Sequence, residues 1–291
     1  MSTNIPYLDE VWNLTRGCTK VSAGCKNCYA ERLLRRFCTD TLTGDYRFDG
    51  FKADCPIELC DDKVLDRPLH WRRPRRVGVC FMSDLFHEKV DDLFILEVWL
   101  VMAMAQEHTF LVLTKRPERM RDLLRDNFLP SMRDRGVFAA DFWPLPNVWL
   151  GVSVENQQAA DERIPLLLDT PAAHRWLSVE PLLEAVDLRR VSPGLLGTSA
   201  IFDALGGRRW EDNGETLNAT ACARLDWVVV GGESGPNARP MKVEWMSDLQ
   251  QQCLRADVPF YCKQDSGPRP GMQGRIPLSL WAVKDLPESW A

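Results

Sequence analysis

The sequence predicts an α/β protein with a parallel sheet, arranged as a partial or full TIM-like barrel of six or seven βα units. Short apolar runs alternate with segments of helical composition over most of the chain, which is typical of parallel sheets covered by helices. Nearly every apolar run ends in a polar or charged residue. The repeat carries no nucleotide-binding fingerprint, which favours a barrel over a doubly wound sheet.

The elements follow one another at regular intervals. A short segment at 11–14 precedes a cysteine-containing loop, and a charged helix is expected at 29–37. Further strands are expected at 77–81, 110–114, 148–154, 175–179, 225–230 and 259–263. Helices are expected at 91–106, 118–125, 157–168 and 243–256.

The length of 291 residues suits one large domain. We therefore expect a single barrel domain over residues 1–291, interrupted in two places. Residues 38–76 contain several Gly and Pro breakers and are expected to be irregular. Residues 190–224 are rich in Gly, Ser, Asn and Thr, which indicates a surface insertion.

The chain has ten cysteines but no basic and apolar leader at its start. This combination favours a reducing cytoplasm, in which clustered cysteines indicate metal ligands rather than disulfides. The most apolar stretch, 93–105, is interrupted by Glu97 and is too short to cross a bilayer. We expect it to form a buried helix and expect no membrane association.

Cys18, Cys25 and Cys28 stand at C-x6-C-x2-C spacing in a loop punctuated by glycines. Thiolates are the soft ligands that zinc and iron–sulfur clusters prefer. A structural zinc site normally has four protein ligands, so three cysteines favour a site with one position open for chemistry. Two alternatives stay open: packing of small hydrophobic cysteines, and zinc with a distant fourth ligand. Candidates for that fourth ligand are Cys38, Cys55 and Cys60.

The predicted strands are apolar until their C-terminal ends, where polar residues follow. In a parallel barrel these ends meet at one rim, which is where active sites lie. Glycines 231 and 232 lie in such a turn, and we expect them to allow close approach of the backbone to a ligand. The polar residues are Asp84, Lys115 with Arg116, Ser153 with Glu155 and Asn156, Ser178 with Glu180, Glu233 with Ser234, and Lys263 with Gln264.

A set of motifs extends over most of the chain. It begins at Trp12-Asn13 and continues through the cysteine loop up to Glu31. Further motifs lie at 113–118, 148–156, 178–183, 230–235, 238–241 and 259–264. Together they resemble a phage-associated family of unknown function that is known for its three-cysteine motif. That family is carried by bacteriophages and bacterial mobile elements.

The chain also resembles radical S-adenosylmethionine (SAM) enzymes, because three clustered cysteines precede a βα repeat. In those enzymes three thiolates hold a 4Fe–4S cluster, and the methionine moiety of SAM chelates the fourth iron. One electron from the cluster cleaves SAM to a 5′-deoxyadenosyl radical, which abstracts a substrate hydrogen. The resemblance implies that Cys18, Cys25 and Cys28 are the cluster ligands.

The same resemblance assigns roles at the strand ends. Asp84 would accept from the methionine ammonium, and Ser153, Glu155 or Asn156 would hydrogen-bond the ribose. Glycines 231 and 232 would approach the cofactor. The residues expected to bind or protonate the substrate are Lys115, Glu180, Glu233 and Lys263.

The expected function is therefore that of a radical SAM-type enzyme supplied with electrons by a reductant protein. Its substrate is not identified by the sequence; a nucleotide or nucleic acid is one candidate. The arginine-rich stretch 67–76 weakly favours a nucleic-acid substrate, while the net charge of −5 gives no support for one. The main alternative is a zinc- or cluster-stabilised binding protein acting on a phage or host partner. Hydrolytic chemistry ranks last, because the four histidines fall in no catalytic motif.

Overall fold

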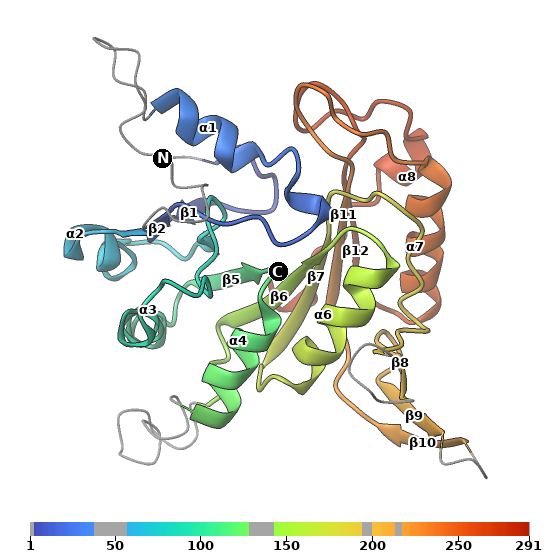
Figure 1. Cartoon of the computed structure of the whole chain (residues 1–291), viewed down its shortest axis with the longest axis horizontal. Helices are drawn as coiled ribbons and strands as arrows, with labels where there is room; N and C mark the ends of the chain where they lie inside the picture. The colour runs from blue at the N-terminus through green and yellow to red at the C-terminus, as the bar shows by residue number, and fades with distance from the viewer. Residues whose placement is uncertain (1–2, 38–56, 128–142, 194–199, 213–216, 291) are drawn as a thin grey trace. The chain divides into compact units, whose positions relative to one another are not determined.

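The computed structural model describes residues 3–37, 57–127, 143–193, 200–212 and 217–290. Its principal sheet has seven strands in the order β1-β4-β5-β6-β7-β11-β12 (Figure 1). The pairing is parallel from β1 through β4 to β5, and from β7 through β11 to β12. The α/β class with a parallel sheet is thus confirmed. In this order β1 and β12 are edges, so the described strands do not form a closed TIM barrel.

The chain divides into two compact units, an N-terminal unit of residues 1–149 and a C-terminal unit of residues 150–291. The first strands of the sheet are β1 (Glu10–Trp12), β4 (Arg76–Val79) and β5 (Thr109–Thr114). β6 (Val148–Val154) runs across the boundary between the units. The remaining strands are β7 (His174–Val179), β11 (Trp227–Gly231) and β12 (Phe260–Gln264).

Three helices of the N-terminal unit form where the sequence predicts them. They are α1 (Tyr29–Phe37), α3 (Asp92–Met104) and α4 (Pro117–Arg121), the last continued by a π-helical turn, η3 (Asp122–Asn127). Asp91 caps α3 by accepting from the backbone of Leu93 at 2.7 Å, which satisfies one of the free N–H groups of the first turn. The middle of α3 is buried, as expected from its apolar composition.

The predicted irregular segment contains regular structure in its described part. β3 (Glu58–Leu59) pairs with β2 (Thr15–Arg16), and α2 (Asp62–Leu65) and the 3₁₀ helix η2 (Arg67–His70) follow. Asp61 caps α2 through Val64 at 3.0 Å. These elements are too short to give a periodic hydrophobic pattern, so the sequence does not signal them.

The C-terminal unit has α6 (Gln157–Asp169) and α7 (Val243–Arg255) as its long helices, with α8 (Leu278–Trp281) and the 3₁₀ helix η6 (Glu288–Trp290) near its end. α7 packs on β11 and β12, and α8 packs on β12. The predicted insertion contains a separate antiparallel sheet. Its strands are β8 (Ile201–Asp203), β9 (Arg208–Asp212) and β10 (Leu217–Ala221).

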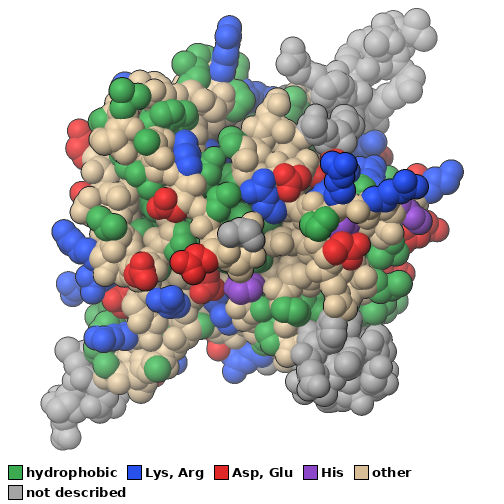
Figure 2. All heavy atoms as spheres, turned by 180° about the vertical axis from the view of Figure 1, so that it is seen from behind, with side chains coloured by type: hydrophobic (Ala, Val, Ile, Leu, Met, Phe, Trp, Pro, Cys, Tyr) green, Lys and Arg blue, Asp and Glu red, His purple; other side chains and the backbone are tan. Residues whose placement is uncertain are grey.

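The surface carries charges of both signs. On the face drawn in Figure 2, acidic and basic side chains are interspersed among apolar ones, in keeping with the small net charge of −5. No helix in the described ranges is long and apolar enough to cross a membrane.

Candidate functional site

The cysteine loop lies between β2 and α1 of the N-terminal unit. Cys25 ends a single 3₁₀ turn, η1 (Ala23–Cys25), and its backbone donates to Ser22 at 3.0 Å. Cys28 directly precedes α1. An ion pair of 2.9 Å between Lys20 and Glu31 ties the loop to that helix. The three loop cysteines are partly exposed free thiols, so they are accessible to a metal or a reagent.

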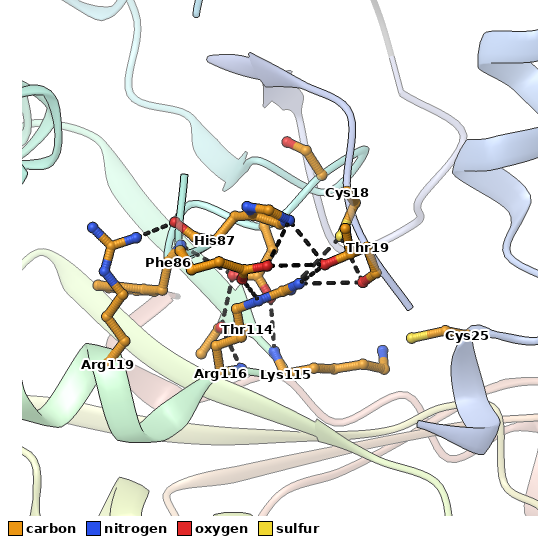
Figure 3. A network of polar contacts seen from close by, with 12 residues as sticks. Cys18, Thr19, Cys25, Phe86, His87, Thr114, Lys115, Arg116 and Arg119 are labelled. Carbon is orange, nitrogen blue, oxygen red and sulfur yellow. Dashed lines mark hydrogen bonds and ion pairs between the residues drawn. The ribbon is translucent and has the colours of Figure 1, made fainter. Parts of the chain in front are cut away.

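Arg116, which follows β5, fastens the first part of this loop to the strand ends (Figure 3). Its Nη1 lies 3.7 Å from the Cys18 thiol and 3.1 Å from the Asp84 carboxylate. Its Nη2 donates to the Thr19 hydroxyl at 2.7 Å and to the Thr19 carbonyl at 3.2 Å. Its Nε donates to Glu88 at 3.0 Å. The guanidinium therefore joins the loop to the segments that follow β4 and β5.

Asp84 is the centre of this network and is 5% exposed. One carboxylate oxygen accepts from the Thr114 hydroxyl at 2.7 Å and the Phe86 backbone at 3.0 Å. The other accepts from the Lys115 backbone and from Arg116, both at 3.1 Å. Both oxygens thus have two donors each. This geometry suits a residue that orients Arg116; the role of Asp84 towards a methionine ammonium stays a prediction.

The protonation of the network follows from burial and from the guanidinium. Burial raises the pKa of the Cys18 thiol to about 11, with a further rise from Asp84, although Arg116 opposes it. Burial and the nearby Arg116 lower the pKa of His87, so this imidazole is neutral at neutral pH. Its Nε2 lies 2.9 Å from the Thr19 hydroxyl. Arg116 keeps its charge: burial opposes it, but Asp84 and Cys18 raise its pKa.

The donor set of the loop suits a thiolate-bound metal or cluster, because three partly exposed thiols stand within eleven residues. The side chains do not converge. Over the described ranges, no group of three or more His, Cys, Asp or Glu side chains is close enough together to hold a metal ion. The chemistry of the donors fits, whereas a bound cluster requires the loop to bring the thiols together. Lys115 extends towards Cys25 in Figure 3.

In the C-terminal unit, three predicted residues at strand ends meet. The Lys263 ammonium lies 2.5 Å from the Glu180 carboxylate. Gln264 donates to the same carboxylate at 3.1 Å and to the Gly232 carbonyl at 2.8 Å. Glu180 and Lys263 keep side-chain exposures of 21% and 16%. They are a carboxylate and a cation that a polar ligand can still reach.

The other predicted residues of this unit are engaged in the fold. Glu155 is 1% exposed and pairs with Arg163 of α6 at 3.1 Å. Glu233 is held by Arg239, which contributes its backbone N–H at 2.8 Å and its Nε at 3.0 Å. Asn156 caps α6 by accepting from Ala159 at 2.9 Å, and Ser153 donates to the Glu180 carbonyl at 2.9 Å. Their predicted contacts with a cofactor or substrate stay predictions.

The chain shows clear similarity to one family. A model of the family described as protein of unknown function (DUF5131) matches residues 2–273. The chain belongs to this family. Comparisons with curated proteins and with solved structures find no match. The family description states no activity, so the phage association and the likeness to radical SAM enzymes stay predictions, and any function must be argued from the site.

Gly231 and Gly232 lie close to the chain's own atoms. A Cβ on Gly231 would stand 3.2 Å from the Glu180 carboxylate, and one on Gly232 would stand 2.3 Å from the backbone nitrogen of Ser266. In this structure the missing side chains let β11 approach the turn after β12. Their predicted closeness to a cofactor stays a prediction.

Replacing Gly232 with alanine is expected to lower the free energy of unfolding by about 1–3 kcal/mol, because the new methyl group overlaps backbone that cannot rotate away. Urea unfolding followed by tryptophan fluorescence measures this. Gly267→Ala is the matched control, since its Cβ would meet nothing closer than the Met272 sulfur at 3.5 Å. Equal unfolding midpoints for the two variants would contradict the close-approach explanation.

The sequence does not reveal the roles of Arg116 and Thr19. Arg116 is one of several polar residues that follow predicted strands, and Thr19 belongs to no recognised motif of ligands. Both act through contacts between segments far apart in sequence, such as 18–19 and 84–88. The sequence signal for Arg116 is its place in the pair Lys115-Arg116 at the end of a strand.

The arginine-rich stretch is largely neutralised where it joins β4. Arg75 pairs with Glu10 at 3.1 Å and stacks over Trp71 with its guanidinium carbon 5.0 Å from the ring centre. Arg76 pairs with Asp9 at 3.0 Å. The exposed arginines of this stretch are Arg72 and Arg73.

Proposed function

We propose that this protein is a radical SAM-type iron–sulfur enzyme. The observation that carries the proposal is the loop of three partly exposed thiols that follows β1, the first strand of the parallel sheet. Its first cysteine contacts Arg116 and is thereby tied to the C-terminal ends of the next strands. Parallel α/β sheets bind their ligands at these ends.

In this proposal Cys18, Cys25 and Cys28 would hold a 4Fe–4S cluster, to which SAM would bind. The cluster would supply the electron that cleaves SAM to a 5′-deoxyadenosyl radical. The protein binds and orients the reactants. Arg116 holds the Cys18 end of the loop against Asp84 and Glu88.

The polar groups at the strand ends of the C-terminal unit are a proposed binding site for a polar ligand. The pair Glu180 and Lys263 offers a hydrogen-bond acceptor and a cation that stay partly exposed, which suits a polar or anionic substrate. A nucleotide, or a nucleic acid encountered in a phage or mobile-element context, has this character. A small low-potential reductant protein is the proposed electron donor.

Anaerobic reconstitution with iron and sulfide is expected to give a brown protein with about four irons per chain. Incubation with SAM and dithionite is then expected to release 5′-deoxyadenosine, measured by chromatography and mass spectrometry. A protein that contains the full cluster but leaves SAM intact would contradict the enzyme proposal. The control is the same incubation without reductant, in which no 5′-deoxyadenosine should form.

The zinc-stabilised binding module gains no specific support from Cys60. β2 pairs with β3 so that Thr15 lies opposite Leu59, and the Cys60 backbone donates to Leu14 at 2.8 Å. Cys60 therefore lies at the end of β2 away from Cys18. Cys38 and Cys55 lie outside the described residues. Zinc bound at one per chain, with no iron taken up, would favour this module.

A further inference from the structure

Glu180 and Lys263 meet at the carboxyl ends of β7 and β12, two strands that have β11 between them. Gly231 ends β11 and lies opposite Gln264 of β12. A Cβ on Gly231 would stand 3.2 Å from the Glu180 carboxylate and 3.3 Å from the Gln264 side chain. The glycine therefore leaves room for a carboxylate on one side of β11 to reach the side chains on the other side.

Gln264 holds the carboxylate in place and is itself fully engaged. Its amide nitrogen donates to Glu180 at 3.1 Å and to the Gly232 carbonyl at 2.8 Å. Its amide oxygen accepts from the Gly271 backbone at 2.8 Å. The residue is 1% exposed. Gln264 thus positions Glu180 and is shielded from a ligand that arrives from solvent.

Glu180 and Lys263 keep hydrogen-bonding capacity of their own. An ammonium has three donors, and within the described ranges the Lys263 ammonium has one partner, Glu180 at 2.5 Å. An ionised carboxylate has about four acceptor positions, of which Lys263 and Gln264 fill two on Glu180. Both side chains are also partly exposed. Open donors and open acceptors therefore stand side by side where a small ligand reaches them.

The charges of the pair favour one kind of ligand. One carboxylate stands against one ammonium, so the site as a whole is neutral. A ligand that carries only an anion satisfies Lys263 but places a like charge beside Glu180. A ligand that carries only a cation has the reverse problem. A ligand with both charges on neighbouring groups forms an attractive contact with each partner.

We propose that Glu180 and Lys263 bind a zwitterionic group of the α-amino acid type, with its ammonium on Glu180 and its carboxylate on Lys263. The two charged groups of such a ligand share one carbon, so they are close neighbours, as the two protein groups are. The pair keeps its own contact, because the ligand uses the donors and acceptors that are left over. This inference rests on the proposed function, whose polar ligand it assigns to one chemical class.

Saturation-transfer NMR titrations of the full-length protein, purified without added metal, test this assignment. Glycine is the probe, because it carries the zwitterionic group and no side chain, while acetate and methylamine each supply one of its charges. Glycine is expected to bind about tenfold more tightly than either, the scale of one charged hydrogen bond. Glu180→Gln and Lys263→Met should each weaken glycine binding by about the same factor. Lys263→Arg, which keeps the cation, should retain most of it.

Arg189→Gln is the matched control in the same unit. Arg189 also pairs with a carboxylate, that of Asp203 at 3.3 Å, and its side chain is 51% exposed. Because this pair does not lie at the ends of the parallel strands, the variant should bind glycine as the wild type does. A loss in Arg189→Gln as large as in Glu180→Gln would overturn the inference.

The other outcomes separate the ligand class from the site. Acetate bound as tightly as glycine, or unchanged glycine binding in Glu180→Gln, would overturn the inference. The nucleotide AMP is a further probe: if AMP binds through Lys263 and glycine does not bind, the zwitterion is wrong and the polar-ligand site of the proposed function stands. If none of the four probes binds, that site is contradicted as well. Glu180→Gln keeps the shape of the side chain, so it decides if Lys263→Met does not fold.

Discussion

Replacing Asp84 with asparagine is expected to lower the free energy of unfolding by about 3 kcal/mol, the scale of breaking a buried ion pair. The amide has nearly the same shape as the carboxylate, so packing is unchanged. One of its sides still accepts from Thr114 and Phe86. The other turns an NH₂ group towards the Lys115 N–H and the Arg116 guanidinium, which donate there. Three donors then face one another in a buried site.

Urea unfolding gives the free energy, and hydrogen–deuterium exchange over the cysteine loop gives the local effect. The loop amides should exchange faster in Asp84→Asn, because Arg116 loses the carboxylate that orients it. Asp92→Asn is the matched control. The Asp92 side chain is 53% exposed in its pair with Arg119, so its loss should cost less than about 1 kcal/mol. Similar losses of unfolding free energy in the two variants would show that the Asp84 network stabilises the protein no more than an exposed ion pair does.

The strands were the most predictable part of the fold. The run 148–154 coincides with β6, and 110–114 differs from β5 by one residue. Fully buried strands of a parallel sheet are continuous apolar runs, so they stand out from polar connections. The closure of the sheet was not predictable in this way. It depends on which strands pair at the two edges, and hydrophobic pattern carries no information about that.

The polar residues were predictable in position but not in role. The rule that strand ends carry polar groups holds for Asp84, Glu155 and Glu180. What each one contacts depends on partners such as Arg163, which lies eight residues beyond Glu155 across the start of α6. The partner of Glu233 is nearer in the sequence, because Arg239 follows it by six residues. A carboxylate followed within one turn or loop by an arginine is a candidate for a structural pair before a catalytic one.

Arg116 shows the limit most clearly. Arg116 contacts residues that lie 28 to 98 positions before it in the sequence. Nothing in the local sequence distinguishes it from Lys115. The side chains of two consecutive residues after a strand project in different directions, so Arg116 enters the network with its guanidinium and Lys115 enters it with its backbone N–H. The choice between them needs the three-dimensional path of the chain.

Cys25→Ala is expected to abolish cluster uptake, from about four irons per chain to nearly none, because two thiolates do not hold the cluster in place of three. The same change should barely affect folding. Cys25 is partly exposed, and the 3₁₀ turn that contains it has no buried residue. Its sulfur lies 4.0 Å from the Ser22 hydroxyl, a contact of little strength. In Cys25→Ala the iron content should therefore fall while the unfolding curve stays close to that of the wild type.

This separation lets the experiment test the ligand role rather than the stability of the loop. Cys222→Ser is the matched control, since Cys222 is also a partly exposed free thiol but lies between β10 and β11. It should keep the full iron content. If Cys25→Ala retains iron while its metal-free unfolding curve matches the wild type, Cys25 is not a ligand. Loss of iron in Cys222→Ser as well would indicate non-specific thiol binding, and the cysteine loop would no longer be the metal site.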